Sequence, residues 1–414
     1  MRLAIVLAFI PIVATAAAPS LPDRYRDMTL IVTDAATVDD GAVVADRLAK
    51  ALAPAGQLFF PPNVIVMRVP ATQMPVVLAE RCVVAVTKTP PSDAIAALAR
   101  APHARDGVSF VRAVHEGTLA IPPYSGPPRP LLEEVRSPAS RPRPASASAG
   151  RTRTPGKVAS AVNDVFSGRT AINVFWVESN GAIDPNEFTW PASLHAIQAN
   201  RFSDSLWWWT YVAQNQGVSL TFSVAYRSVH SGNYEVLQPY EPIWHKSGQQ
   251  YLWTDAIMSN LGYTTGDERD RIAAFNAASR AQLLADKAFC VFMIYNPPEE
   301  GAPSTFDDRR AAIANMGGPS FSILYRNGGW TPAEFPMVAA HEIGHQFWAC
   351  DEYDSGFGCG AVCGVCAPDG PRPHLVNHNC GACQNPPLTC LMRDTGAAYS
   401  GGVLCTHTKQ QIGW

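Results

Sequence analysis

Short apolar runs rich in β-branched residues alternate with longer segments of mixed polarity over the first part of the chain. Apolar runs of this length are typical of strands, and the longer mixed segments are typical of helices. The pattern predicts strands at 29–34, 63–69 and 82–90, and helices at 39–56, 71–81 and 92–101. We therefore expect a small α/β or α+β N-terminal domain over residues 19–125.

The same alternation returns with longer elements between residue 161 and the C-terminus. It predicts strands at 172–179, 220–228, 288–296 and 320–327, and helices at 192–217 and 265–286. Thr265 and Glu268 have capping-box spacing at the start of the second helix. The tryptophans at 207–209, in the first helix, favour a core or subdomain contact over a ligand platform. Strands alternating with helices predict an α/β fold with a largely parallel sheet.

A segment of different composition, residues 126–160, separates these two parts. It is rich in Pro, Ser, Ala and Arg. Such a segment cannot bury enough apolar surface to order itself, so we predict a disordered linker. Exposed Arg-rich linkers are also easily cut by proteases. Two alternatives stay open for residues 19–125, which are either a removable pro-segment or a permanent accessory domain on a tether.

Residues 1–18 have the pattern of a secretory signal peptide. Arg2 precedes an apolar stretch from Leu3 to Val13, and small residues follow at Ala14–Ala18. The apolar stretch is too short to span a bilayer. We therefore predict a secreted protein, extracellular or periplasmic, with no membrane span after signal removal. The formal net charge of −3 gives no reason to expect nucleic acid as a partner.

Cysteine usage agrees with export. The chain has ten cysteines, and eight of them lie between Cys350 and Cys405. Dense cysteine in a loop-rich part of an exported chain favours disulfides over a structural zinc site, although the pairing cannot be read from the sequence. Cys82 lies in the apolar setting RCVVAV, which favours a buried cysteine or a disulfide over a thiolate that keeps a metal site latent.

The segment HEIGH carries the candidate chemistry. Thr331 and Glu334 have capping-box spacing at the start of a helix. In that helix His341 and His345 are four residues apart, so both project from one face and can share one metal ion. Glu342 lies beside them, where it can take a proton from zinc-bound water. This combination predicts a hydrolytic zinc site.

A third protein ligand is expected for such a site. Asp351, Glu352 and Asp354 follow closely. A straight helix would carry Glu352 roughly 10 Å beyond His345, so the chain must turn back after His345. Reach alone leaves Asp351 and Glu352 as alternatives.

The segment HEIGHQFWACDEY resembles the zinc segment of the metzincins, whose pattern is HExxHxxGxxH or HExxHxxGxxD. CLMRD is similar to their Met-turn, TKQQIGW to the end of many such domains, and GGPSFSILYRNGGW to a segment of exported bacterial relatives. The resemblance covers roughly residues 161–414. It implies a twisted sheet above a cleft, a smaller C-terminal subdomain below it, and Met392 beneath the metal. It also implies His341, His345 and Asp351 as metal ligands and Glu342 as the base.

Two features near this segment bear on the resemblance. Trp348 stands where the metzincins have the glycine that lets the chain turn. A left-handed backbone conformation costs a non-glycine residue about 1–2 kcal/mol, so we expect the turn to be built differently. Cys390 and Cys405 flank the Met-turn segment and are candidates for a disulfide that staples it.

The sequence therefore predicts a zinc metallopeptidase domain at 161–414. The expected protein is a monomeric, secreted endopeptidase that uses Zn²⁺ and acts on protein or peptide substrates. Glu342 would activate the zinc-bound water and return the proton to the leaving amine. Tyr353, His378 and Tyr399 are the candidates for stabilising the oxyanion. The alternative is a non-catalytic, zinc-containing binding protein on the same scaffold.

Overall fold

The computed structural model describes residues 23–52, 56–119, 163–297, 300–326, 330–353, 365, 367, 370–379, 383 and 387–414. The predicted signal peptide and linker lie outside the described residues, as does Asp354. The division into domains at the linker therefore stays a prediction.

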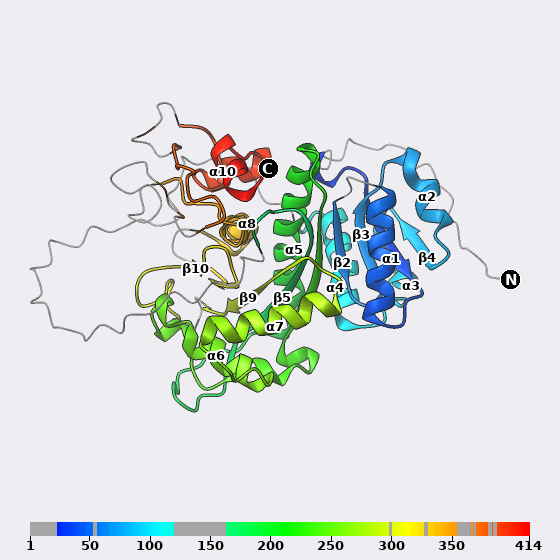
Figure 1. Cartoon of the computed structure of the whole chain (residues 1–414). Helices are drawn as coiled ribbons and strands as arrows, with labels where there is room; N and C mark the ends of the chain where they lie inside the picture. The colour runs from blue at the N-terminus through cyan, green and yellow to red at the C-terminus, as the bar shows by residue number, and fades with distance from the viewer. Residues whose placement is uncertain are drawn as a thin grey trace, which may run out of the picture.

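A nine-stranded sheet with helices on both faces forms the centre of the molecule (Figure 1). Its strand order is β10-β11-β9-β5-β7-β2-β3-β1-β4. The strands are β1 (Met28–Thr33), β2 (Gln57–Phe60), β3 (Val64–Arg68), β4 (Val83–Thr87), β5 (Gly168–Trp176), β7 (Leu220–Arg227), β9 (Lys287–Ile294), β10 (Ala312–Ala314) and β11 (Ser320–Leu324). A two-stranded sheet pairs β6 (Glu178–Ser179) with β8 (Leu237–Gln238).

The sheet is parallel in its centre and antiparallel at both margins. Strands β11, β9, β5, β7 and β2 run parallel, whereas β10 and the β3-β1-β4 group pair antiparallel with their neighbours. The predicted α/β class is confirmed at the level of a mixed, largely parallel sheet flanked by helices.

The helices are α1 (Val38–Ala51), α2 (Met74–Ala79), α3 (Asp93–Ala96), α4 (Pro102–His115), α5 (Ala192–Asn215), α6 (Tyr251–Asn260), α7 (Glu268–Gln282), α8 (Phe335–His345), α9 (Thr395–Gly401) and α10 (Thr406–Ile412). Among the described residues, no helix combines the length and apolar composition that a membrane span requires. Helix α7 is capped by Asp267, whose side chain accepts from the Asp270 amide at 3.1 Å. The capping box predicted at Thr265 is therefore wrong by two residues.

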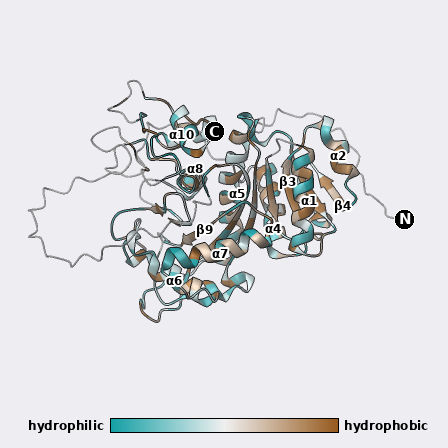
Figure 2. Cartoon of the chain, in the orientation of Figure 1, coloured by the Kyte–Doolittle hydropathy of each residue, from teal (hydrophilic) through white to brown (hydrophobic). Residues whose placement is uncertain are grey.

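Strand alternation divides the core into two layers. Leu30, Leu58 and Val66 pack in the cluster that contains α4 and α5, whereas Ile31 and Phe59 pack against α1 on the opposite face. Nearly all positions of the central strands β11, β9, β5, β7 and β2 are buried because helices cover both faces of the sheet, whereas the edge strands β4 and β10 are only partly buried. Figure 2 shows the hydrophobic colouring concentrated in these strands.

The predicted N-terminal unit (residues 19–125) and the predicted metallopeptidase unit (residues 161–414) both contribute strands to this sheet. Strand β2, from the first unit, pairs in parallel with β7, from the second, through Leu58↔Phe222 and its neighbours. The completely buried Asp204 of α5 lies 3.1 Å from the Arg24 guanidinium and accepts from Tyr25. The N-terminal unit is thus part of the same core as the candidate catalytic unit.

Three consecutive tryptophans in α5 connect this helix to three parts of the fold. The indole N–H groups of Trp207, Trp208 and Trp209 donate to the carbonyl oxygens of Arg24, Tyr399 and Ala340, respectively. All three rings are completely buried. The prediction that this cluster is core is confirmed, and Trp209 fixes α5 against α8 one residue before His341.

Candidate metal centre

Helix α8 places HEIGH in the interior. A short 3₁₀ turn (Pro332–Glu334) leads into the helix, and the Thr331 amide donates to the Glu334 carboxylate at 2.7 Å. Every residue of α8 from Phe335 to His345 is buried. A helix that is buried on all sides is apolar all round, so the polar side chains it carries need an explanation.

The structure brings His341, His345 and Asp351 together. Nε2 of His341 lies 2.9 Å from Oδ1 of Asp351 and 3.1 Å from Nε2 of His345. Nε2 of His345 lies 3.2 Å from the same Asp351 oxygen. Both histidines are at least nine-tenths buried, and Asp351 is partly exposed. Three potential ligand atoms therefore converge on one point at the edge of the interior.

The backbone fixes which nitrogen of each ring faces this point. Nδ1 of His341 lies 3.2 Å from the Leu391 carbonyl oxygen, and Nδ1 of His345 lies 2.7 Å from that of Ala349. A carbonyl oxygen can only accept, so each Nδ1 carries a proton, and Nε2 is the nitrogen that has a lone pair when the ring is neutral. Two lone pairs and a carboxylate facing one another repel unless a cation or an additional proton lies between them.

The pKa values reflect this concentration of charge. Burial by itself would lower the pKa of His345, but the Asp351 carboxylate, together with Glu342 and the Ala349 carbonyl, more than offsets it and raises that pKa to about 9. Burial would raise the pKa of Asp351, but His345 and His341 hold it well below its usual range. Burial raises the pKa of Glu342, while His345 and His341 oppose that rise. The centre therefore favours positive charge at the histidine–aspartate cluster.

A left-handed turn at Trp348 returns the chain to the histidines. Trp348 has a φ of +74°, and the Ala349 amide donates to the Gly344 carbonyl at 3.1 Å. The prediction that the turn is built differently without glycine is wrong, because Trp348 adopts the conformation that glycine would favour. Its ring packs closely against the backbone of two glycines, Gly317 and Gly370. This packing offsets the conformational cost.

Glu352 lies away from the histidines. Its completely buried carboxylate accepts hydrogen bonds from Asn379 at 2.5 Å, Thr408 at 2.8 Å and Cys405 at 2.9 Å. Its amide donates to the Met392 carbonyl at 2.9 Å. Of the two alternatives for a third ligand, the structure therefore places Asp351 with the histidines and gives Glu352 a bridging position in the C-terminal part.

The predicted Met-turn packs beneath α8. Met392 is completely buried, and the Arg393 and Asp394 amides both donate to the Cys390 carbonyl. A Cβ at Gly344 would lie 2.9 Å from Sδ of Met392, so this close approach requires glycine. Because Leu391 also accepts from His341, the turn supports the metal-facing orientation of that ring.

The cysteines follow the prediction in part. Cys350 and Cys383 are disulfide-bonded, whereas Cys359, Cys363, Cys366 and Cys380 lie outside the described residues. Cys82, Cys290, Cys390 and Cys405 are free thiols. The expected staple between Cys390 and Cys405 is wrong for this structure, in which the two thiols are neighbours and Cys405 donates to Glu352.

Of the three candidates for stabilising an oxyanion, Tyr353 contacts the residues of the candidate metal centre, whereas the contacts of Tyr399 and His378 are with other residues. The Tyr353 ring stacks on His341 at 6.0 Å and its hydroxyl hydrogen-bonds to Asp351. Tyr399 instead donates to Asp204 at 2.7 Å, and the His378 ring lies 5.7 Å from that of His407. Arg310, from the loop before β10, also acts on Glu342 electrostatically. Sequence reasoning missed Arg310 because only the folded chain brings it near HEIGH.

No protein-family model, curated protein or solved structure matches the chain. The interpretation of the site therefore depends on its own geometry and on the physical chemistry of its residues.

Proposed function

We propose that the protein is a secreted zinc-dependent endopeptidase of the metzincin type. The observation that carries this proposal is the convergence of the Nε2 atoms of His341 and His345 with one Asp351 carboxylate oxygen, with Glu342 next to His341 in the same helix. Two buried histidines with a salt-bridged aspartate would serve stability alone equally well. However, a stabilising ion pair needs neither a second histidine facing the same carboxylate oxygen nor a buried glutamate beside the histidines.

The donor set fits a zinc ion. Tetrahedral zinc with bonds of about 2.0–2.2 Å separates its ligands by about 3.3 Å. The three separations here are 2.9, 3.1 and 3.2 Å, so an outward movement of a few tenths of an ångström suffices. Two imidazoles and one carboxylate form a catalytic type of zinc ligand set, in which a further position stays open. His341, His345 and Asp351 would hold the ion.

Bound zinc would polarise the scissile carbonyl and lower the pKa of a water molecule to about 7. Glu342 would accept a proton from the attacking water and donate it to the leaving amine. Its buried position favours this role, because burial raises the pKa of the Glu342 carboxyl toward the range where a base can also act as an acid. Tyr353, which contacts Asp351, is the described hydroxyl best placed to donate to a developing oxyanion.

The decisive experiment measures zinc content and casein cleavage on the full-length protein, with and without a chelator. We expect the chelator to abolish cleavage. We also expect the double variant, which carries both His341→Gln and His345→Gln, to bind about one zinc per chain fewer than the parent. Glu342→Gln should keep that zinc and lose activity by at least about 10²–10⁴-fold. Glu116→Gln, an exposed change at the end of α4, is the control and should keep both.

The outcomes separate the proposal from its alternative. Zinc lost with the two histidines but no cleavage of any peptide substrate would favour a binding protein. Unchanged zinc content in the double histidine variant would refute the metal centre itself.

A further inference from the structure

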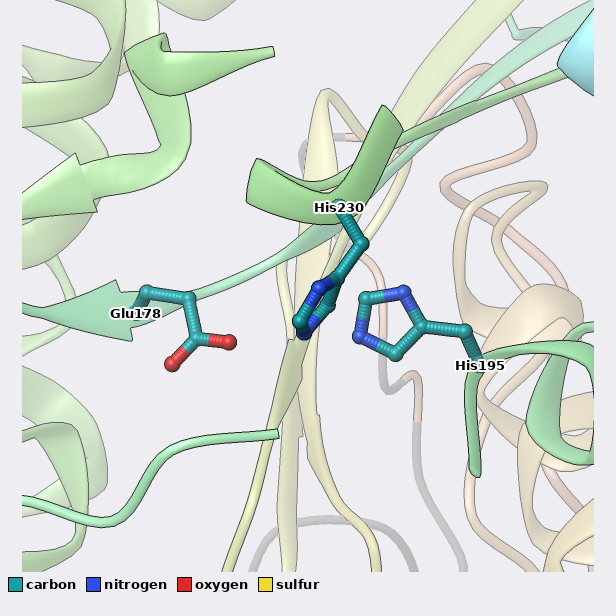
Figure 3. Close-up of side chains that lie close together, drawn as sticks. All are labelled: Glu178, His195 and His230. Carbon is teal, nitrogen blue, oxygen red and sulfur yellow. The ribbon is translucent and has the colours of Figure 1, made fainter. Parts of the chain in front are cut away.

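A second cluster of metal-binding residue types lies outside the centre on α8. Glu178, His195 and His230 each offer a ligand atom, and these atoms all lie within 4.8 Å of one another. In Figure 3 the carboxylate and the two rings point toward a common space, and one ring nitrogen of His195 faces it. The three residues come from β6, from the first turn of α5 and from the 3₁₀ turn Val229–Ser231.

The topology of the sheet brings these segments together. Strands β5 and β7 are parallel neighbours whose register ends at Phe175↔Arg227, so their carboxyl ends meet at one edge. Glu178 follows β5 by two residues, and His230 follows β7 by three. Helix α5 begins at this same edge. In open α/β sheets, ligands bind outside the carboxyl ends of the strands.

The existing hydrogen bonds leave ligand capacity in the cluster. Nε2 of His195 is buried and has no hydrogen-bond partner in the part of the chain that the structure describes. The His230 Nε2–H donates to the Trp190 carbonyl at 3.0 Å, so Nδ1 of that ring keeps a lone pair. The Glu178 carboxylate accepts only the Trp190 amide, at 3.1 and 3.4 Å, among the hydrogen bonds of the described residues. A carboxylate retains further acceptor capacity beyond one such bond.

Aromatic rings pack against the cluster but leave it accessible from solvent. The His195 ring packs against Trp176 and Trp190, with centroids 5.3 and 6.1 Å apart. Glu178 is only 3% exposed, His195 is half-buried and His230 is exposed. A cation can therefore reach the cluster from solvent and meet a buried carboxylate there.

We propose that Glu178, His195 and His230 form a second site, which binds a divalent transition-metal cation such as Zn²⁺ and ties together the segments after β5 and β7. Two imidazoles with one carboxylate suit zinc, cobalt or nickel, whereas calcium and magnesium prefer all-oxygen ligands. This site is separate from the centre on α8. His195 and Trp209, which contacts Ala340, are 14 residues apart on α5, or roughly 21 Å along the helix.

The test uses full-length protein that carries His341→Gln and His345→Gln, so that zinc cannot use the first centre. After removal of metal by a chelator, zinc binding is measured by calorimetry and thermal unfolding is followed with and without zinc. We expect about one zinc per chain and a higher unfolding temperature when zinc is present.

Two further variants in this background identify the ligands. His230→Gln changes an exposed side chain, and Glu178→Gln keeps an oxygen that can accept from the Trp190 amide. Each should weaken zinc binding by about 100-fold or more and remove the thermal shift. His115→Gln is the matched control, because its buried Nε2 also has no partner among the described residues but it belongs to no such cluster. No zinc binding in the double histidine background, or binding that His230→Gln and Glu178→Gln leave unchanged, would overturn the proposal.

Discussion

At the scale of single residues, Trp348 shows how packing can replace backbone freedom. A left-handed non-glycine residue costs about 1–2 kcal/mol, yet the ring at this position covers Gly317 and Gly370. The turn that Trp348 makes brings Asp351 to within hydrogen-bonding distance of His341. The position therefore connects packing to the geometry of the candidate metal centre.

Trp348→Gly tests this balance. Glycine relieves the strain but removes a large, mostly buried ring, and loss of a fully buried aromatic costs about 3–5 kcal/mol. We expect a net loss of about 1–3 kcal/mol in the free energy of unfolding, measured by denaturant titration. Leu284→Gly is the control, since Leu284 also has a positive φ of 48° but is 50% exposed. Leu284→Gly should be neutral or stabilising. If Trp348→Gly also stabilised the protein, the packing of the Trp348 ring would not outweigh its backbone strain.

The adjacent acids Asp351 and Glu352 should respond in opposite ways to loss of charge. Asp351→Asn removes a carboxylate from the proposed ligands, so zinc affinity at that centre should fall by about 100-fold or more. Glu352→Gln should keep the zinc and lower stability by about 1–3 kcal/mol, because its amide would face the donors Asn379, Thr408 and Cys405. Calorimetric zinc binding and thermal unfolding distinguish the two. If Glu352→Gln lost the zinc instead, Glu352 would be the ligand.

At the scale of elements, pattern reasoning found long, strongly periodic segments and missed short ones. The predicted helix at 192–217 corresponds to α5 (Ala192–Asn215), and the strand at 220–228 corresponds to β7. Strand β2 has only the four residues QLFF, too few for alternation to be recognised. Helix α4 begins with Pro102 immediately after another predicted helix, where proline resembles a terminator as much as a start.

The candidate site was likewise predictable only where its residues are close together in the sequence. His341, Glu342 and His345 follow from helical spacing, which is local. The choice of Asp351 over Glu352 required the conformation of Trp348, and Arg310 required the arrangement of distant loops. Such long-range contacts leave no signal in a single sequence. The Glu178 cluster has no sequence signal either, because its three members come from separate elements, and its outer two, Glu178 and His230, are more than 50 residues apart in the chain.

Helix α4 provides a prediction on pH. Burial raises the pKa of Asp106 from 3.8 to about 7, so the folded state holds a proton that the unfolded chain releases at lower pH. The stability contributed by the protonated group is complete below pH 3.8 and is lost as pH rises to about 7. Asp106→Asn should therefore raise the free energy of unfolding at pH 8, on the order of 1 kcal/mol, and change it little at pH 4.

Thermal unfolding of Asp106→Asn across this pH range is the measurement. Asp39→Asn is the control, since Asp39 is exposed in the first turn of α1, where a negative charge stabilises a helix. That control should lose a few tenths of a kcal/mol at pH 8, opposite in sign to Asp106→Asn. A pH-independent effect at Asp106 would show that its burial does not perturb its titration.

At the scale of the whole molecule, the continuous sheet constrains what cleavage of the predicted linker can do. The N-terminal unit supplies β1–β4, and its β2 completes the hydrogen bonding of β7. Its departure would expose a parallel strand edge and the core residues of α4 that pack against α5. It would also leave Asp204 without Arg24 and Tyr25. A pro-segment released by linker cleavage alone would have to overcome all of these costs.

We therefore expect a chain cut once between residues 120 and 162 to remain one particle. Both fragments should co-elute in size-exclusion chromatography under native conditions and separate only in denaturant.

Asp204→Asn removes the charge that offsets the buried Arg24 guanidinium, and losing one partner of a buried ion pair costs about 3–5 kcal/mol. The nicked Asp204→Asn protein should therefore separate at a lower denaturant concentration than the nicked parent. Asp23→Asn, which removes an exposed ion pair with Arg26, should leave that concentration unchanged. Spontaneous separation of the nicked parent would instead support a removable pro-segment, because the β2–β7 junction would then be too weak to hold the units together.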